Sequence, residues 1–272
     1  MNYYPVDDIN IPELALFNER AETKLYRFYE PDPGLFVVET PMVIERALAA
    51  GYEPVAMVGE EAIARREAER LAPQLGDIPV YLSTDRVLSE IAGYRLARGL
   101  LCEFRRRKLP DPETVCAGAS RVVLLEEVQN PTNVGAIFRS AAALGMEAVL
   151  LSKGCADPLY RRASRVSVGN VFLVPWTIFD SRMTAAQRIS WLKAQGYVTV
   201  AMALSDNAVR LGEQDFGGEE KIAVIMGNEG EGLSAETIEA CDVVVKIPMG
   251  NGVDSLNVAA ASAIAFWELR KK

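Results

Sequence analysis

The 272-residue sequence contains no histidine, and its four cysteines form no CxxC pair. No metal site is expected, since the usual zinc ligands are missing, and histidine-dependent triads and general bases are excluded. No stretch approaches the length of a membrane span. Residues 1–10 are polar, with neither a basic start nor an apolar run, so we expect no signal peptide. Scattered cysteines of this kind are typical of reduced thiols in a cytoplasmic protein.

Positive charge is also scarce, because 29 Lys and Arg face 37 Asp and Glu, for a net charge of −8. This balance argues against a surface that coats nucleic acid broadly. Two basic clusters stand out, Arg105–Lys108 and the group of Arg161, Arg162 and Arg165. Each cluster alone is more often solvated surface charge, but a local binding site is not excluded.

Half of the residues are hydrophobic, so the chain can build a full core. Short apolar runs alternate with helical patterns from about residue 35 onward, and residues 171–174 are predicted to be one of the strands. This alternation predicts an α/β fold with parallel or mixed sheets. The proline-containing stretch 109–119 predicts a linker between domains 1–108 and 120–272.

Three polar stretches of the second domain follow or adjoin predicted strands. In the first, residues 130–140, Pro131 suits a first helical turn and Asn130 suits its cap. Asn133 and Arg139 are six residues apart, so on a regular helix they point about 120° from each other. They serve one site only if Asn133 reaches it from the helix start. A capped, ordinary helix with a surface arginine is the alternative.

The second and third stretches, residues 226–234 and 247–257, are glycine-bearing loops after apolar strands. Glycines there allow close approach of the backbone to a ligand. The second reads GxxGxG, which disfavours the dinucleotide-binding fingerprint GxGxxG. Alone, each loop is equally consistent with a tight turn or close helix packing. Together, the three stretches point to one ligand site at the carboxyl edge of a sheet and to group transfer from a bound cofactor.

Taken in order, these stretches resemble the three motifs of the SpoU (TrmH) family of SPOUT RNA methyltransferases. The matches are Asn130-Pro131-x-Asn133-x-Gly135 with Arg139-Ser140, Met226-Gly227-Asn228-Glu229-Gly230, and Ile247-Pro248-Met249 with Ser255-Leu256-Asn257. The resemblance implies methyl transfer from S-adenosylmethionine to a ribose 2′-hydroxyl of RNA. It also implies a deep trefoil knot within residues 120–272, so the expected class is α/β with a knotted C-terminal methyltransferase domain and a smaller N-terminal RNA-binding domain.

The resemblance assigns roles to individual residues. Gly227, Ile247 and Leu256 match positions that hold the cofactor, Leu204 is a weaker match, and Met226 and Met249 complete the predicted cofactor-binding set. The predicted catalytic and substrate-positioning set is Asn133, Arg139, Glu229, Ser255 and Asn257. The family assigns activation of the 2′-hydroxyl to Arg139. Because a guanidinium stays protonated, stabilising the developing alkoxide or holding a phosphate is the more physical role.

The N-terminal domain resembles the substrate-binding domain of longer family members, which is similar to an RNA-binding ribosomal-protein fold. We therefore expect ribosomal RNA as the partner, docked on the basic clusters, and a homodimer formed through the knotted domain. A tRNA 2′-O-methyltransferase and a non-catalytic RNA-binding relative are the alternatives. A nicotinamide-dependent oxidoreductase is disfavoured by the glycine spacing.

Overall fold

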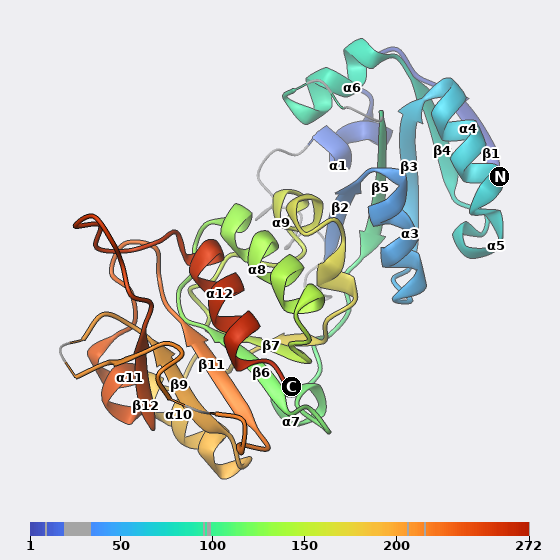
Figure 1. Cartoon of the computed structure of the whole chain (residues 1–272). Coiled ribbons are helices and arrows are strands. Elements are labelled where there is room, and N and C mark those ends of the chain that lie inside the picture. Colours follow the sequence, from blue (N-terminus) through green and yellow to red (C-terminus); the bar gives the residue numbers. More distant parts are fainter. Residues whose placement is uncertain are drawn as a thin grey trace. The chain divides into compact units, whose positions relative to one another are not determined.

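A computed structural model describes residues 1–8, 10–18, 34–94, 96, 99–205, 207–214 and 216–271. The chain forms two compact units (Figure 1). The first contains residues 1–108 together with 159–172, and the second contains residues 109–158 and 173–272. Each unit combines a β-sheet with helices, which confirms the predicted α/β class.

The first unit is built on a mixed five-stranded sheet in the order β1-β4-β3-β5-β2. Its strands are β1 (Asn2–Pro5), β2 (Leu35–Glu39), β3 (Pro54–Glu60), β4 (Pro79–Ser83) and β5 (Leu100–Arg105). β5 runs antiparallel to both β2 and β3, whereas β1, β4 and β3 are parallel. β2 is buried along its whole length, as expected for a strand covered on both faces.

Short helices cover this sheet. They are η1 (Pro12–Leu14), α1 (Ala15–Asn18), α3 (Pro41–Ala49), α4 (Glu61–Arg70), α5 (Ala72–Leu75) and α6 (Asp85–Ala92). The sequence sets their ends locally: Pro41 starts α3, and the Thr84 hydroxyl accepts from the backbone N–H of Val87 to cap α6. One apolar core lies between the sheet, α1 and α6 and includes Val58, Leu88 and Leu101.

A distant part of the sequence completes this unit. Residues 159–172 contain α9 (Arg161–Val166) and the 3-10 helix η2 (Asn170–Phe172), so the strand predicted for residues 171–174 is wrong. The ring of Phe172 packs against Phe36 and Tyr52, and Arg46 donates to the carbonyl of Val168 over 2.7 Å. Tertiary packing of Phe172 thus overrides the local strand preference of Val171 and Phe172.

The second unit contains a seven-stranded, fully parallel sheet in the order β10-β12-β9-β11-β6-β7-β8. Its strands are β6 (Arg121–Leu125), β7 (Ala148–Leu151), β8 (Trp176–Ile178), β9 (Val198–Met202), β10 (Val209–Arg210), β11 (Ile222–Met226) and β12 (Val243–Lys246). The central strands β6 and β11 are buried at every residue, as continuous apolar runs in parallel sheets usually are.

The helices of the second unit are α7 (Pro112–Val115), α8 (Pro131–Ala143), α10 (Ala185–Ala194), α11 (Ala235–Ala240) and α12 (Val258–Leu269). α8 and α12 lie side by side (Figure 1). Asn130 caps α8 by accepting from the N–H of Thr132, and Asn257 caps α12 by accepting from the N–H of Ala259, both at 2.9 Å. Both helices therefore begin at polar residues that the motifs had singled out.

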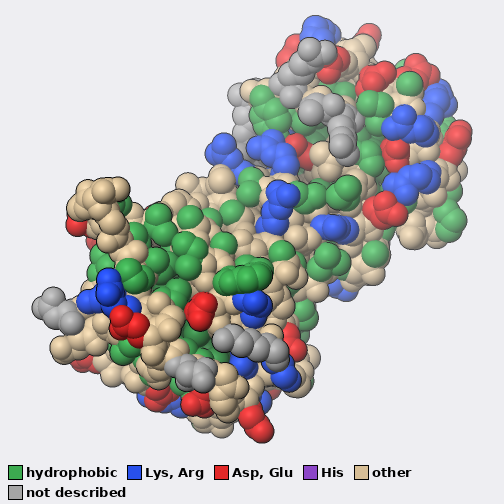
Figure 2. Space-filling model, in the orientation of Figure 1, with side chains coloured by type: hydrophobic (Ala, Val, Ile, Leu, Met, Phe, Trp, Pro, Cys, Tyr) green, Lys and Arg blue, Asp and Glu red, His purple; other side chains and the backbone are tan. Residues whose placement is uncertain are grey.

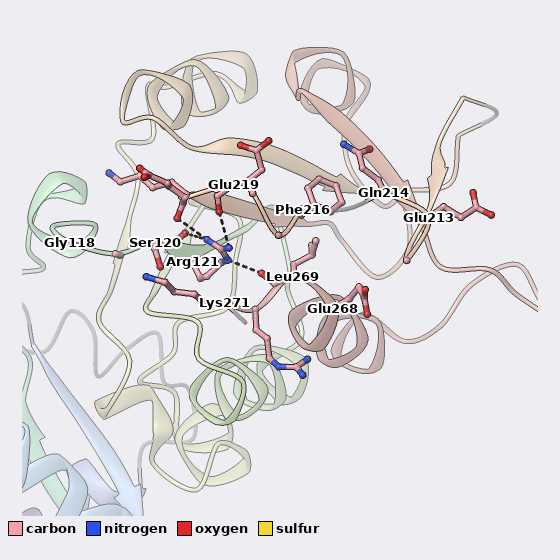
Figure 3. Close-up of a pocket in the computed structure, with 17 residues that line it drawn as sticks. Gly118, Ser120, Arg121, Glu213, Gln214, Phe216, Glu219, Glu268, Leu269 and Lys271 are labelled. Carbon is pink, nitrogen blue, oxygen red and sulfur yellow. Dashed lines mark hydrogen bonds between the residues drawn. The ribbon is translucent and has the colours of Figure 1, made fainter.

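A cavity of about 780 Å³ lies at the amino ends of β6 and β11. Arg121, one of the cationic residues that line it, is almost wholly buried and donates to the backbone carbonyls of Leu269, Glu220 and Glu219 (Figure 3). These bonds tie the end of α12 to the sheet, so Arg121 serves packing. Among the described residues, no helix is long and apolar enough to cross a membrane.

Candidate active site

The second and third motif loops enclose a cavity of about 470 Å³ at the carboxyl edge of the parallel sheet. The loop after β9 supplies a third wall. The cavity is lined by residues 202–204, 226–233, 238, 245–247, 249, 255–258 and 261. A ligand site at this edge is the common arrangement in α/β sheets, and the volume suits a nucleoside-sized molecule.

The loop after β11 closes on itself tightly. Asn228 and Gly232 exchange backbone hydrogen bonds of 3.0 and 3.1 Å, and the Asn228 side chain accepts from the N–H of Gly230 at 2.7 Å. A Cβ atom at Gly227 would lie 2.4 Å from the carbonyl carbon of Gly232. Only glycine fits at position 227. Because it has no side chain, the two sides of the loop pack closely together at the edge of the cavity.

Three side chains from the three motifs form a hydrogen-bonded chain beside the cavity. The amide nitrogen of Asn133 donates to Oε1 of Glu229 over 2.8 Å, and that of Asn257 donates to Oδ1 of Asn133 over 3.2 Å. Glu229 also accepts from the backbone N–H of Asn130 at 3.2 Å. The amide orientation of Asn133 is therefore determined from both sides, with its nitrogen toward the carboxylate.

A buried carboxylate, that of Glu126, holds the same loop through hydrogen bonds. Glu126, directly after β6, accepts from the backbone N–H of Ser234 at 2.8 Å and from the hydroxyl of Thr237. Its own N–H donates to the carbonyl of Met226 at 2.9 Å. The loop between β11 and α11 is thus anchored at both ends, a role for Glu126 that sequence reasoning missed.

All six residues predicted to bind the cofactor line the cavity. They are Leu204, Met226, Gly227, Ile247, Met249 and Leu256. Leu204 and Leu256 are 59 % and 39 % exposed, so apolar side chains stand at a surface where a bound molecule would cover them. Apolar walls combined with backbone from two tight loops fit an adenosine moiety. Cofactor binding by these individual residues stays a prediction.

The predicted catalytic residues divide into two groups. Glu229, Ser255 and Asn257 line the cavity, and Asn133 joins them through its hydrogen bonds. Arg139 does not line it. Asn133 is 7 % exposed whereas Arg139, further along α8, is exposed, consistent with the angle that six helical residues impose.

Among the cavity residues without a predicted role, Asn228 and Lys246 form side-chain hydrogen bonds that shape the site. Asn228 shapes the loop through its Asx-type turn, and an asparagine directly after Gly227 and two residues before Gly230 was a usable signal. Lys246, the last residue of β12, lines the cavity and donates from Nζ to the carbonyl of Ser205 at 3.2 Å. A cation at the end of a predicted strand was visible in the sequence, but its orientation was not.

Both basic clusters belong to the first unit, where several members have internal partners. Arg106 is buried and donates to the carbonyl of Leu35 at 3.0 Å, and Arg105 donates to Glu53 at 3.2 Å. Arg161 and Arg165 contact the buried carboxylate of Glu39 at 3.4 and 3.3 Å. The exposed members are Arg105, Arg107, Lys108 and Arg162. Docking of RNA on these clusters stays a prediction.

The fold and the site define a cofactor-dependent transferase domain with an appended α/β unit, and comparison with known proteins places it further. Residues 120–267 match the SpoU rRNA Methylase family. An uncharacterised tRNA/rRNA methyltransferase of Mycobacterium tuberculosis is 41 % identical over 237 residues, covering 86 % of this chain and 80 % of that protein. The 23S rRNA guanosine 2′-O-methyltransferase RlmP of Bacillus subtilis is 35 % identical over 159 residues, covering 58 % of this chain and 61 % of that protein.

Among solved structures, an rRNA methyltransferase from Sinorhizobium meliloti with bound AdoMet superposes with a TM-score of 0.82 at 23 % identity. The match covers 98 % of this chain and 97 % of that one, so the fold is shared. The chain belongs to the SpoU rRNA methylase family. It is an S-adenosylmethionine-dependent RNA ribose 2′-O-methyltransferase, as the motifs predicted.

Proposed function

We propose that this enzyme methylates a ribose 2′-hydroxyl of ribosomal RNA. The observation that carries the proposal is the chain Asn257–Asn133–Glu229, which places three motif side chains at one rim of the cofactor cavity. The relative RlmP is named for a guanosine of 23S rRNA, so a guanosine of the large subunit is the expected target. The additional α/β unit supports a large structured RNA as substrate.

When bound, S-adenosylmethionine would supply an electrophilic methyl group: as the ribose 2′-oxygen bonds to the methyl carbon, the bond to the sulfonium sulfur breaks, S-adenosylhomocysteine is the leaving group, and the hydroxyl proton passes to solvent. Met226, Ile247 and Leu256 would hold the adenosine part through apolar contact and adjacent backbone groups. The Gly227–Gly232 loop forms one wall of the cavity. Rigid loops of this kind position the reacting atoms, which is the main contribution a protein makes to group transfer.

Asn133 and Asn257 orient the ribose by hydrogen bonds, and Glu229 holds Asn133 in one amide orientation. Ser255 lines the cavity near Asn257 and can hydrogen-bond the incoming nucleotide. The sequence contains no histidine, so no histidine lines the cavity. The proposed catalysis therefore relies on positioning and electrostatics.

Arg139 requires a separate explanation because it lies on the exposed side of α8. The neighbouring helix α12 is apolar nearly all round, and it exposes Ile264 and Trp267 at 41 % and 57 %. Figure 2 shows apolar side chains gathered over this region of the C-terminal unit. We therefore propose a homodimer interface on α8 and α12, in which Arg139 enters the site of the second copy and stabilises the 2′-alkoxide or the adjacent phosphate.

The trefoil knot expected for residues 120–272 also stays a prediction.

The decisive experiment maps 2′-O-methyl groups in total RNA from cells with and without this protein. The expected result is the loss of one modified position in ribosomal RNA when the protein is absent. Loss of a tRNA position instead would move the substrate to the alternative class. An unchanged map, with purified protein inactive on both RNA classes, would support the non-catalytic relative.

A further inference from the structure

Lys246 has a distinctive place in the cofactor cavity. Among the described residues that line the cavity, it is the sole lysine or arginine, and two carboxylates, Glu229 and Glu231, accompany it. Lys246 is half-buried at the end of β12. An ammonium group carries three N–H donors, and one of them is used on the carbonyl of Ser205.

The remaining donors of Lys246 have no partner within the part of the chain that the structure describes. No described carboxylate forms an ion pair with this ammonium, whereas Lys193, another half-exposed lysine of the unit, pairs with Asp242 at 2.8 Å. A half-buried ammonium is favoured when an opposite charge lies close to it. Lys246 therefore faces the cavity with unused capacity for an anion.

The cofactor provides a matching anion, because the methionine part of S-adenosylmethionine ends in a carboxylate. We propose that Lys246 binds this carboxylate. This assignment rests on the proposed function, in which S-adenosylmethionine is the cofactor. It names Lys246 as the residue that recognises the amino-acid end of the cofactor rather than its adenosine end. Of the two carboxylates that line the cavity, Glu229 is engaged by Asn133, which leaves Glu231 as the counterpart for the cofactor's ammonium.

A second effect of Lys246 must be separated from this one. Its bond to Ser205 also steadies the loop that carries Leu204, a wall of the cavity. If Lys246 acts only by holding this loop, its substitution should lower the affinity of every ligand of the cavity equally. If Lys246 binds the carboxylate, its substitution should lower the affinity only of ligands that carry the carboxylate.

The test uses Lys246→Met in the full-length protein and isothermal titration with three ligands. S-adenosylhomocysteine has the carboxylate, its decarboxylated analogue lacks only that group, and methylthioadenosine lacks the whole amino-acid end. The expected result is a loss of about tenfold in affinity for S-adenosylhomocysteine, from one charged hydrogen bond. The affinities for the other two ligands stay within about twofold of wild type, a difference below the contribution of one hydrogen bond. Lys246→Arg restores most of the loss.

Lys221→Met is the matched control. Lys221 also donates from Nζ to a loop carbonyl, that of Gln195 at 3.1 Å, but it lies at the opposite end of the sheet. This variant should bind all three ligands as wild type does. Equal losses for all ligands in Lys246→Met, or no loss for S-adenosylhomocysteine, would overturn the assignment. A wild-type protein that binds none of the three would overturn the proposed cofactor itself.

Discussion

The amide nitrogen of Asn133 donates to Oε1 of Glu229 over 2.8 Å, joining two motifs that lie 96 residues apart. Replacing Asn133 by Asp would set two carboxylates at hydrogen-bonding distance. Their repulsion should lower kcat about 100-fold at pH 8, with little change in cofactor affinity, because an aligned catalytic contact is lost. Single-turnover methylation measures the rate. Activity should recover partly at acid pH, where the pair shares a proton.

The exposed Asn207→Asp is the control for added charge and should be active. Full activity of Asn133→Asp at pH 8 would show that the contact with Glu229 has no part in positioning the substrate.

Arg139 is expected to act at the cavity of the partner copy. Arg139→Ala and Asn133→Ala should each be inactive as homodimers. In a mixed dimer one site regains both residues, so re-association of equal amounts should restore about a quarter of wild-type activity in a symmetric dimer. Methylation assays on mixtures before and after subunit exchange measure this. Mixtures that stay inactive despite proven exchange would place Arg139 in its own site.

Gly227 and Gly230 lie in one loop but differ in the space around them. A Cβ at Gly227 would be 2.4 Å from backbone atoms of Gly232, whereas one at Gly230 would meet its nearest atom at 3.4 Å. Gly227→Ala should open the loop and lower the affinity for S-adenosylhomocysteine by at least about tenfold, the loss expected when a preorganised site is distorted. Gly230→Ala should bind within about twofold of wild type, since an ordinary contact is accommodated. Similar affinities for both variants would contradict the steric account.

Glu103 lies in the core of the first unit, 1 % exposed, and its Oε1 has no hydrogen-bond partner among the described residues. Burial raises the pKa of Glu103 to about 8. At pH values between the ordinary pKa of a glutamate and about 8, the Glu103 carboxyl is therefore protonated in the folded state and ionised in the unfolded state. Stability from the neutral carboxyl is fully present below that ordinary value and is progressively lost as the pH rises to about 8.

Glu103→Gln should remove this pH dependence and stabilise the first unit at pH 9 by up to roughly 5 kcal/mol relative to wild type, the free energy that corresponds to the raised pKa. Hydrogen exchange of β5 amides reports this unit alone, which is necessary because separate units can unfold in separate steps. The exposed Glu53→Gln serves as the control. Parallel pH profiles for wild type and Glu103→Gln would refute a neutral buried carboxyl.

Glu39 is 3 % exposed and receives hydrogen bonds from Arg165 and from the hydroxyl of Tyr94. Glu39→Gln should destabilise the first unit by about 1–3 kcal/mol, since buried charged donors lose their acceptor. Hydrogen exchange of α9 amides measures the effect. Glu53→Gln breaks an exposed pair with Arg105 and should change stability by less than about 1 kcal/mol. Equal effects of the two substitutions would argue against a buried network.

Much of the fold follows from local patterns in the sequence. The apolar runs 122–125 and 222–226 form buried strands, and Asn130 and Pro131 start a helix as predicted. The six cofactor-binding candidates meet at one cavity because each adjoins a parallel strand or one of its loops, and the carboxyl ends of such strands share an edge. These features depend on residues close together in the chain, which sequence patterns describe well.

Long-range packing decided the rest. Residues 159–172 join the first unit because Phe172 fits beside Phe36 and Tyr52, and no local pattern contains that pairing. Glu126 and Lys246 acquire their positions from loops that are distant in sequence. The sequence by itself determined the family, the motif residues and strands with long apolar runs such as 122–125 and 222–226. Only the tertiary structure decided which side chains touch, since contacts such as Asn133 to Glu229 arise when separate strands assemble into one sheet.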